Sequence, residues 1–200
     1  LVDEYKPYRF PDPCEGYEVP TAVSETELKQ LANSINTLPA DKKFFSKIVK
    51  LMDDRTQMVA NNKVDWALGE LLAYATLLKE GIPVRLSGQD AQRGTFSHRH
   101  SALVLEDSGE KYFPLQNISS DQAPFVVYNS PLNEYGVMGF EYGYSMANPK
   151  GLTIWEGQFG DFANVAQVGT GDRFTSNKLL TETIFIGLVA EEKVDYILNY

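Results

Sequence analysis

The stretch VDWALGELLAYATLLKEGIPVRL, from Val64 to Leu86, decides the fold class of this chain. Its first part, Val64–Glu80, predicts an amphipathic helix, because apolar residues recur there at helical spacing, at Leu68, Leu71, Leu72, Ala75 and Leu78. Gly81 can take the left-handed conformation that ends a helix. The apolar run Ile82–Leu86 follows at once and predicts a strand. A helix that leads directly into a strand is typical of α/β proteins.

Elements of both kinds alternate around this stretch. Ser24 and Glu27 form a capping box, which predicts a helix that ends before Pro39. Ser130 and Pro131 suit the cap and first position of another helix. The remaining expected elements are a helix around 44–52, a hairpin over 101–115 with its turn at 107–109, the end of the capped helix near Ala147, and strands at Phe125–Tyr128 and Leu152–Glu156. We therefore expect an α/β fold with a mostly parallel sheet flanked by helices.

Length and charge restrict the class of protein. Two hundred residues suit one domain with a core of its own. The net charge of -9 argues against nucleic acid or an anionic membrane as the main partner. No apolar stretch approaches the roughly 20 residues that a membrane helix needs. Cys14 is the only cysteine, so we expect a reducing compartment, and the start at Leu1 shows no signal-peptide pattern.

The stretch RLSGQDAQRGTFSHRH, from Arg85 to His100, is unusually dense in polar groups. It contains both histidines of the chain and follows a predicted strand, where α/β folds hold their ligands. His98 and His100 are two residues apart and would face the same side of an extended segment. The composition alone fits a solvated surface loop as well as it fits a ligand-binding loop.

Two further sequence motifs, YNSPLNEYGVMGFEYGY and LTIWEGQFGDFANVAQV, follow in the chain. Together with RLSGQDAQRGTFSHRH they resemble the decarboxylating, thiamine-diphosphate-dependent component of 2-oxoglutarate dehydrogenase, in the same order and spacing, over about residues 40–168. The resemblance implies the transketolase-like domain that binds the aminopyrimidine ring. Together with the prolines of residues 1–20 and the helical patterns that follow them, it suggests four segments: an extended lead-in over 1–20, a helical connection over 21–62, the pyrimidine-binding domain over 63–168 and an unplaced tail over 169–200.

The resemblance implies a role for the glutamate of the LNE word. Glu134 would hydrogen-bond a ring nitrogen of the aminopyrimidine and so favour its imino tautomer. Without the resemblance, Glu134 would be a carboxylate stabilised at the positive end of a helix dipole. By the same resemblance, Phe159, Phe162 and Gln158 would bind the cofactor ring, with Trp155 nearby. Aromatic residues at this spacing also suit an ordinary core.

The histidines are implied at the substrate end of the site. His100 would bind the carboxylate of a 2-oxo acid or stabilise the intermediate, and His98 is a second candidate for catalysis. Arg93 would bind the acidic substrate. For Arg93 and Arg99 an equal alternative is a simple ion pair with Asp90.

Part of the expected enzyme is not visible in the sequence. No Gly-Asp-Gly word occurs, so the diphosphate and its magnesium would be ligated by a domain outside this chain, and no metal ligands are assigned here. The implied parent oxidises 2-oxoglutarate and passes a succinyl group to a lipoyl-bearing acyltransferase. It would be a homodimer in the cytoplasm, or in the mitochondrial matrix of a eukaryote. The alternatives are a non-catalytic structural or interaction fragment, a 2-oxoadipate dehydrogenase and a 2-oxoglutarate decarboxylase.

Overall fold

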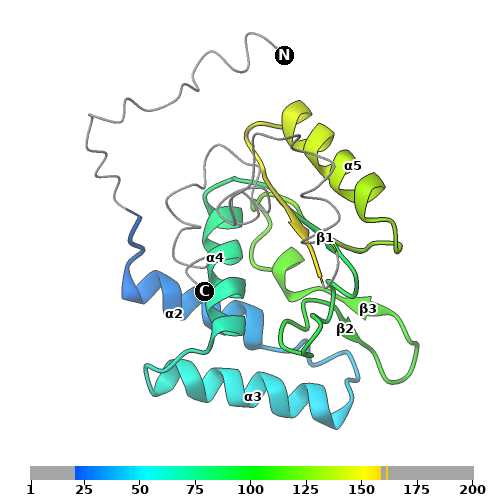
Figure 1. The fold of residues 1–200 in the computed structure, drawn as a ribbon. Coiled ribbons are helices and arrows are strands. Elements are labelled where there is room, and N and C mark those ends of the chain that lie inside the picture. Colours follow the sequence, from blue (N-terminus) through cyan, green and yellow to red (C-terminus); the bar gives the residue numbers. More distant parts are fainter. Residues whose placement is uncertain (1–20, 159–160, 162–200) are drawn as a thin grey trace. The chain divides into compact units, whose positions relative to one another are not determined.

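The computed structural model describes residues 21–158 and residue 161 (Figure 1). The chain divides into two compact units. One holds Val23–Val84 and Asp90–Asn129, and the other holds Arg85–Gln89 and the described residues from Ser130 onward. The expected lead-in over 1–20 and the tail over 169–200 lie outside the described residues.

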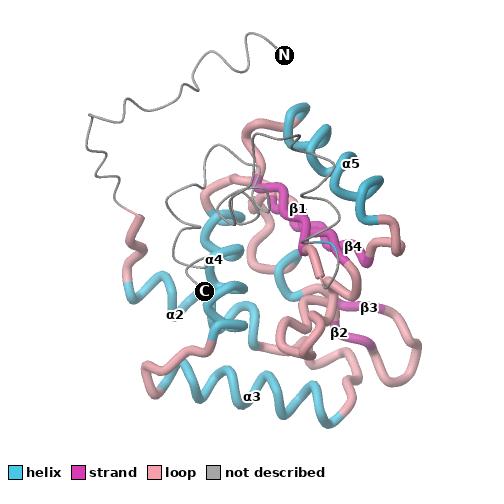
Figure 2. Tube along the Cα trace, in the orientation of Figure 1, coloured by secondary structure: helices cyan, strands magenta, loops and turns pink. Residues whose placement is uncertain are grey.

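Three helices dominate the first unit: α2 (Glu25–Asn36), α3 (Ser46–Ala60) and α4 (Trp66–Lys79). Figure 2 shows them in cyan, and α2 contacts both of the others. The predicted start of α2 is confirmed, since Oγ of Ser24 accepts from the amide of Glu27 at 3.2 Å. The expected helix over 64–80 is α4, which Asp65 caps by accepting from the amide of Leu68 at 2.8 Å. Gly81 follows with the predicted left-handed conformation, at φ +83°.

A two-stranded antiparallel hairpin belongs to the same unit. It pairs β2 (Leu103–Val104) with β3 (Lys111–Tyr112), and Gly109 in its turn has φ +73°. The predicted second arm is too long, because residues Pro114–Gln116 form the 3-10 helix η1. Pro114 lacks an amide proton and cannot continue a ladder. The hairpin packs on α3 through the apolar cluster of Phe44, Met52, Leu103 and Leu105.

Three parallel strands form the main sheet, in the order β4 (Phe125–Asn129), β1 (Val84–Gly88), β5 (Leu152–Glu156). The predicted α/β class is therefore confirmed. The strand expected at 82–86 begins two residues later, because Pro83 has no amide to donate. The amide of Val84, by contrast, donates to the carbonyl of Pro124 at 3.1 Å.

Helix α5 (Glu134–Ala147) packs on β5 in the second unit. The predicted cap at Ser130 is wrong. The amide of Ser130 donates to the carbonyl of Gly88 at 2.8 Å, and this bond holds Ser130 next to the last residue of β1. Asn133 is the cap instead, and its Oδ1 accepts from the amide of Gly136 at 3.0 Å. Glu134 thus becomes the first residue of the helix, and the predicted end at Ala147 is confirmed.

A buried ion pair joins α5 to β1. Nε and Nη2 of Arg85 donate to the two carboxylate oxygens of Glu141 at 2.6 and 2.9 Å. The side chains of this pair are only 15% and 5% exposed. The guanidinium also lies over the rings of Phe140 and Tyr144, at 5.2 and 4.6 Å from their centres. Two parallel hydrogen bonds fix both the distance and the rotation of α5 relative to this strand.

In the part of the chain that the structure describes, no helix combines the length and the apolar character that crossing a membrane requires.

Replacing Arg85 by Met should lower the free energy of unfolding by about 3–5 kcal/mol, because Glu141 then stays buried without its partner. The double variant Arg85→Met/Glu141→Leu should recover much of this loss. Urea unfolding measures both. Lys43→Met is the matched control, since Lys43 and Glu106 form an exposed pair, 68% and 40% accessible, worth about 0–1 kcal/mol. Equal losses for Arg85→Met and Lys43→Met would contradict the assigned role of the buried pair.

Candidate functional site

The polar loop that follows β1 is a series of turns. Asp90 begins it with φ +57°, and its carbonyl accepts from the amides of Arg93 and Gly94. Ser97 and His100 also have positive φ, at 55° and 43°. The idea that His98 and His100 share one side of an extended segment is therefore wrong, since a left-handed residue breaks the alternation of a strand.

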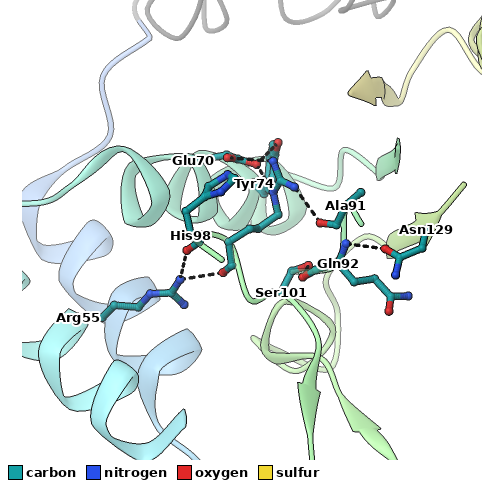
Figure 3. A network of polar contacts seen from close by, with 9 residues as sticks. Arg55, Glu70, Tyr74, Ala91, Gln92, His98, Ser101 and Asn129 are labelled. Atoms are coloured by element: carbon teal, nitrogen blue, oxygen red, sulfur yellow. Dashed lines mark hydrogen bonds and ion pairs between the residues drawn. The ribbon is translucent and has the colours of Figure 1, made fainter. Parts of the chain in front are cut away.

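Buried charged side chains bind this loop, as Figure 3 shows. Nε of Arg99 donates to Oε1 of Glu70 at 2.6 Å, and its Nη1 donates to the carbonyl of Ala91 at 2.8 Å. The hydroxyl of Tyr74 donates to the same oxygen of Glu70 at 2.7 Å. Arg99 is 3% exposed and pairs with Glu70, so both roles considered for it, a substrate contact and a pair with Asp90, are replaced by a structural one.

Arg55 of α3 reaches the same loop. Its Nη2 donates to the carbonyls of His98 and Arg99 at 3.0 and 2.7 Å (Figure 3). The guanidinium is buried, so it satisfies two carbonyls that have little access to water. The backbone that carries the histidines is thus attached to α3 by a permanent cation.

Arg93 lies on the exposed side of the loop. Its Nε and Nη2 donate to Oδ2 of Asp90 at 2.8 and 2.6 Å, and its Nη1 donates to the hydroxyl of Ser97 at 3.0 Å. The alternative that Arg93 pairs with Asp90 is therefore what the structure shows. Because the side chain is half exposed, it remains accessible to an anion from solution.

The two histidines occupy different environments. Nδ1 of His98 is buried and has no hydrogen-bond partner among residues 21–158 and 161. Burial lowers the pKa of His100, and the charges of Arg55 and Arg93 lower it further, against a smaller opposing effect of Asp90. His100 thus stays neutral to lower pH than an ordinary histidine and can act there as a proton or hydrogen-bond acceptor.

Gly94 sets the position of the His98 ring. The glycine is buried at φ +84°, and a Cβ built on it would lie 2.6 Å from Nδ1 of His98. No other residue fits here without moving the imidazole. The glycine of this loop is therefore required both for its turn and for the ring packed on it.

A second group of candidate residues surrounds the N-terminus of α5, within the other unit. The half-buried Glu134 carboxyl is hydrogen-bonded to Asp161, which is 3% exposed. Oδ2 of Asp161 accepts from the amide of Gln158 at 2.7 Å, and Nε2 of Gln158 donates to the carbonyl of Gln89 at 2.7 Å. The structure thus brings Glu134 and Gln158 together through Asp161.

The protonation of Asp161 is perturbed. Burial raises the pKa of its carboxyl, and the charge of Glu134 and their mutual hydrogen bond raise it further, while the Gln158 amide acts in the opposite direction. Because its pKa is raised, Asp161 keeps its proton to higher pH than an ordinary aspartate does. This pair can therefore present a hydrogen-bond donor as well as an acceptor at the start of α5.

Sequence reasoning missed three of these residues. Arg55 follows Met52 by three residues on the buried face of α3, so a charged residue in an apolar stripe was the available signal. Glu70 interrupts the apolar run of α4 in the same way. Asp161 gave no such signal, because its role depends on the long-range approach of Glu134. The candidates Phe159 and Phe162 lie outside the described residues, and Trp155 is a buried residue of β5.

Comparison with protein families gives one match, to the transketolase pyrimidine-binding domain, over residues 62–183. The chain belongs to this family. The match begins after Arg55. It extends past Val168, the last residue of the motifs that resemble the family. The pyrimidine-binding family binds thiamine diphosphate.

Several curated relatives of this pyrimidine-binding chain have the name 2-oxoglutarate dehydrogenase E1 component. Those of Geobacillus kaustophilus and Cupriavidus necator are 49% and 51% identical over 163 residues, and cover 80% and 78% of this chain. That of Rickettsia prowazekii is 45% identical over 175 residues, 87% of this chain. The chain spans only 17–19% of the length of these relatives.

The residues at the N-terminus of α5 fit the pyrimidine end of such a cofactor. An aminopyrimidine presents ring nitrogens and an amino group, which need a hydrogen-bond donor and an acceptor, and the Glu134–Asp161 pair provides both. Across residues 21–158 and 161, no three histidine, cysteine, aspartate or glutamate side chains gather closely enough to hold a metal ion.

Gly94→Ala should displace the His98 imidazole and cost about 1–2 kcal/mol of stability for the left-handed backbone. Gly109→Ala is the control, because Gly109 has φ +73° but no atom within 4 Å of the place that an added methyl group would occupy. Both variants carry backbone strain, but only Gly94→Ala should shift the His98 ring resonances in NMR spectra. Unchanged His98 resonances in folded Gly94→Ala would contradict this packing.

Glu134→Gln should lower the pKa of Asp161, since it removes a like charge and adds an amide donor. Burial continues to raise this pKa in the variant, while the hydrogen bond from the Gln158 amide continues to lower it. A raised carboxyl pKa means that ionisation of Asp161 opposes folding, so its favourable contribution is present below pH 3.8 and is lost as pH rises through the folded-state value. Carboxyl carbon NMR titration measures the change. Glu110→Gln, in the hairpin, should leave the pKa of Asp161 unaltered. If Glu134→Gln also left this pKa unaltered, the interaction between Glu134 and Asp161 would be excluded.

Proposed function

We propose that this chain supplies the pyrimidine-binding half of the active site of a thiamine-diphosphate-dependent 2-oxoglutarate dehydrogenase. The observation that carries the proposal is the contact of Glu134, the first residue of α5, with the buried Asp161. When bound, the cofactor supplies the electron sink for loss of carbon dioxide from a 2-oxo acid. The protein supplies position and control of protons.

Glu134 would contact a ring nitrogen of the aminopyrimidine. Asp161 keeps its proton more readily than an ordinary aspartate, so it can donate to the Glu134 carboxylate and hold it in one orientation. Gln158 fixes the chain on the other side of Asp161 through its backbone amide. Phe159 and Phe162 lie outside the described residues, and by the family resemblance they would stack on the flat ring of the cofactor.

The loop with the histidines would bind the substrate. A 2-oxo acid carries at least one carboxylate, and the surroundings of His100 include the cations Arg55 and Arg93. His100, neutral at physiological pH, would accept or return a proton at the reacting carbonyl, with His98 beside it. Arg93 would attract the carboxylate from its exposed position.

The rest of the reaction belongs to the longer protein. Because the relatives are named 2-oxoglutarate dehydrogenase E1 components, we propose that this longer protein oxidises 2-oxoglutarate. We also propose that it transfers the succinyl group to a lipoyl-bearing acyltransferase. We further propose that magnesium and the diphosphate are held by a domain outside this chain, and that the parent is a homodimer of the cytoplasm or mitochondrial matrix. A related 2-oxoadipate dehydrogenase or 2-oxoglutarate decarboxylase would use the same residues.

One observation favours the alternative of an interaction fragment without chemistry of its own. Large apolar side chains are exposed just before and along α5, namely Leu132, Tyr135, Phe140, Tyr142 and Met146. Exposed large apolar side chains on one element favour an interaction site. It would fit a dimer of the proposed enzyme as well as an isolated fragment.

The test is Glu134→Gln in the full-length parent enzyme. Turnover of 2-oxoglutarate should fall by at least about 10²-fold, as for other losses of a positioned acid or base. The unfolding midpoint should stay close to that of the wild type, because Glu134 is only half-buried. Glu110→Gln is a matched control without expected effect. Unchanged turnover in Glu134→Gln would remove Glu134 from the mechanism and leave the interaction fragment as the better description.

A further inference from the structure

Arg55 is a buried cation that the pyrimidine-binding match does not include. It lies in α3, 3% exposed, on the same face as the core residue Met52. Burial lowers the pKa of its guanidinium, against the favourable charges of Asp65 and Glu70. A buried charge is costly unless its hydrogen bonds and its partners compensate. Its position therefore requires a specific set of contacts.

Those contacts are to the backbone of the histidine loop. The carbonyls of His98 and Arg99 both accept from Nη2 of Arg55. From the opposite direction, the carbonyl of Arg93 accepts from the amides of Arg99 and His100, each at 2.9 Å. The segment 98–100 is thus held by donors and acceptors on both sides, and none of these bonds uses an imidazole.

The backbone at His100 needs such support. Its φ of 43° is in the left-handed region, which costs a residue other than glycine roughly 1–2 kcal/mol. Loss of the guanidinium would also leave two buried carbonyls without their charged donor, and each unsatisfied group costs about 1–3 kcal/mol. The bonds from Arg55 therefore select this strained loop conformation over relaxed ones.

The charge of Arg55 acts on the His100 ring as well. Four ionisable groups influence this imidazole: Arg55 from α3, and Arg93, Asp90 and His98 from the loop itself. Arg93 is neutralised in part by its pair with Asp90. Arg55 has no such partner on the loop, and after burial its charge has the largest effect on the pKa of His100.

We propose that Arg55 is a positioning residue of the substrate-binding loop, which fixes the backbone of residues 98–100 and places a buried positive charge beside His100. The importance of this for catalysis rests on the proposed role of His100 with a 2-oxo acid. The positioning itself is a property of the unliganded chain and can be measured there.

The chain has only two histidines, which makes NMR titration of their rings direct. In Arg55→Met, the pKa of His100 should rise, because a nearby cation is lost. The carbonyl carbon shifts of residues 98 and 99 should move as their donor disappears. Arg55→Lys keeps the charge but not the planar fork, so it should change these carbonyl shifts and leave the pKa of His100 low. Arg55→Lys therefore still tests the proposal if Arg55→Met does not fold.

Lys50→Met is the control, since it removes an exposed cation of the same helix. It should alter neither quantity. Unchanged carbonyl shifts in Arg55→Lys, or an unchanged His100 pKa in folded Arg55→Met, would overturn the inference. Because no cofactor or substrate is present, that result would leave the Glu134 proposal standing. Loss of the Glu134 effect on turnover would in turn leave the measured role of Arg55 intact.

Discussion

The ion pair between Arg85 and Glu141 is the constraint on which the placement of Glu134 depends. It joins the strand before the polar loop to the middle of α5, and its two parallel hydrogen bonds allow little rotation. Glu134 begins this helix, so its placement depends on a contact two turns away, between Arg85 and Glu141. The guanidinium also lies over the rings of Phe140 and Tyr144, which adds a cation–π contribution to the pair.

The histidine loop is stabilised by buried charge rather than by an apolar core. Arg55 and Arg99 each place a guanidinium beneath it, and Glu70 compensates Arg99 directly. Aliphatic residues of similar volume would often be no less stable. They would leave the loop carbonyls unsatisfied, however. They also could not select the observed backbone, in which Asp90, Ser97 and His100 have positive φ angles although none of them is glycine. Here the charged groups specify one shape of the backbone.

Periodicity and turn residues predicted the elements well where local sequence controls them. Helices α2 and α4, the turn at Gly109 and strand β5 lie where their patterns place them. The errors arise where distant groups compete: the Gly88 carbonyl binds the Ser130 amide and moves the helix cap to Asn133. The candidate site residues show the same difference between local and long-range signals. The family motifs indicated Glu134 and His100 as candidates, but the contacts of Asp161 and Arg55 depend on long-range packing that no local pattern encodes.

The two groups of candidate residues differ in their electrostatics, and this difference suits different chemical tasks. Burial and the neighbouring Glu134 raise the pKa of Asp161, so this carboxyl retains its proton more readily, which suits the proposed contact with a heteroaromatic ring that exchanges protons. Around His100, two cations favour the neutral imidazole and attract an anion, which matches a 2-oxo acid. If both proposed roles hold, a single uniform environment could not serve both ligands, because a cation that binds a carboxylate would also keep the proposed cofactor-binding carboxyl ionised. Separate elements with opposite local charge avoid that conflict.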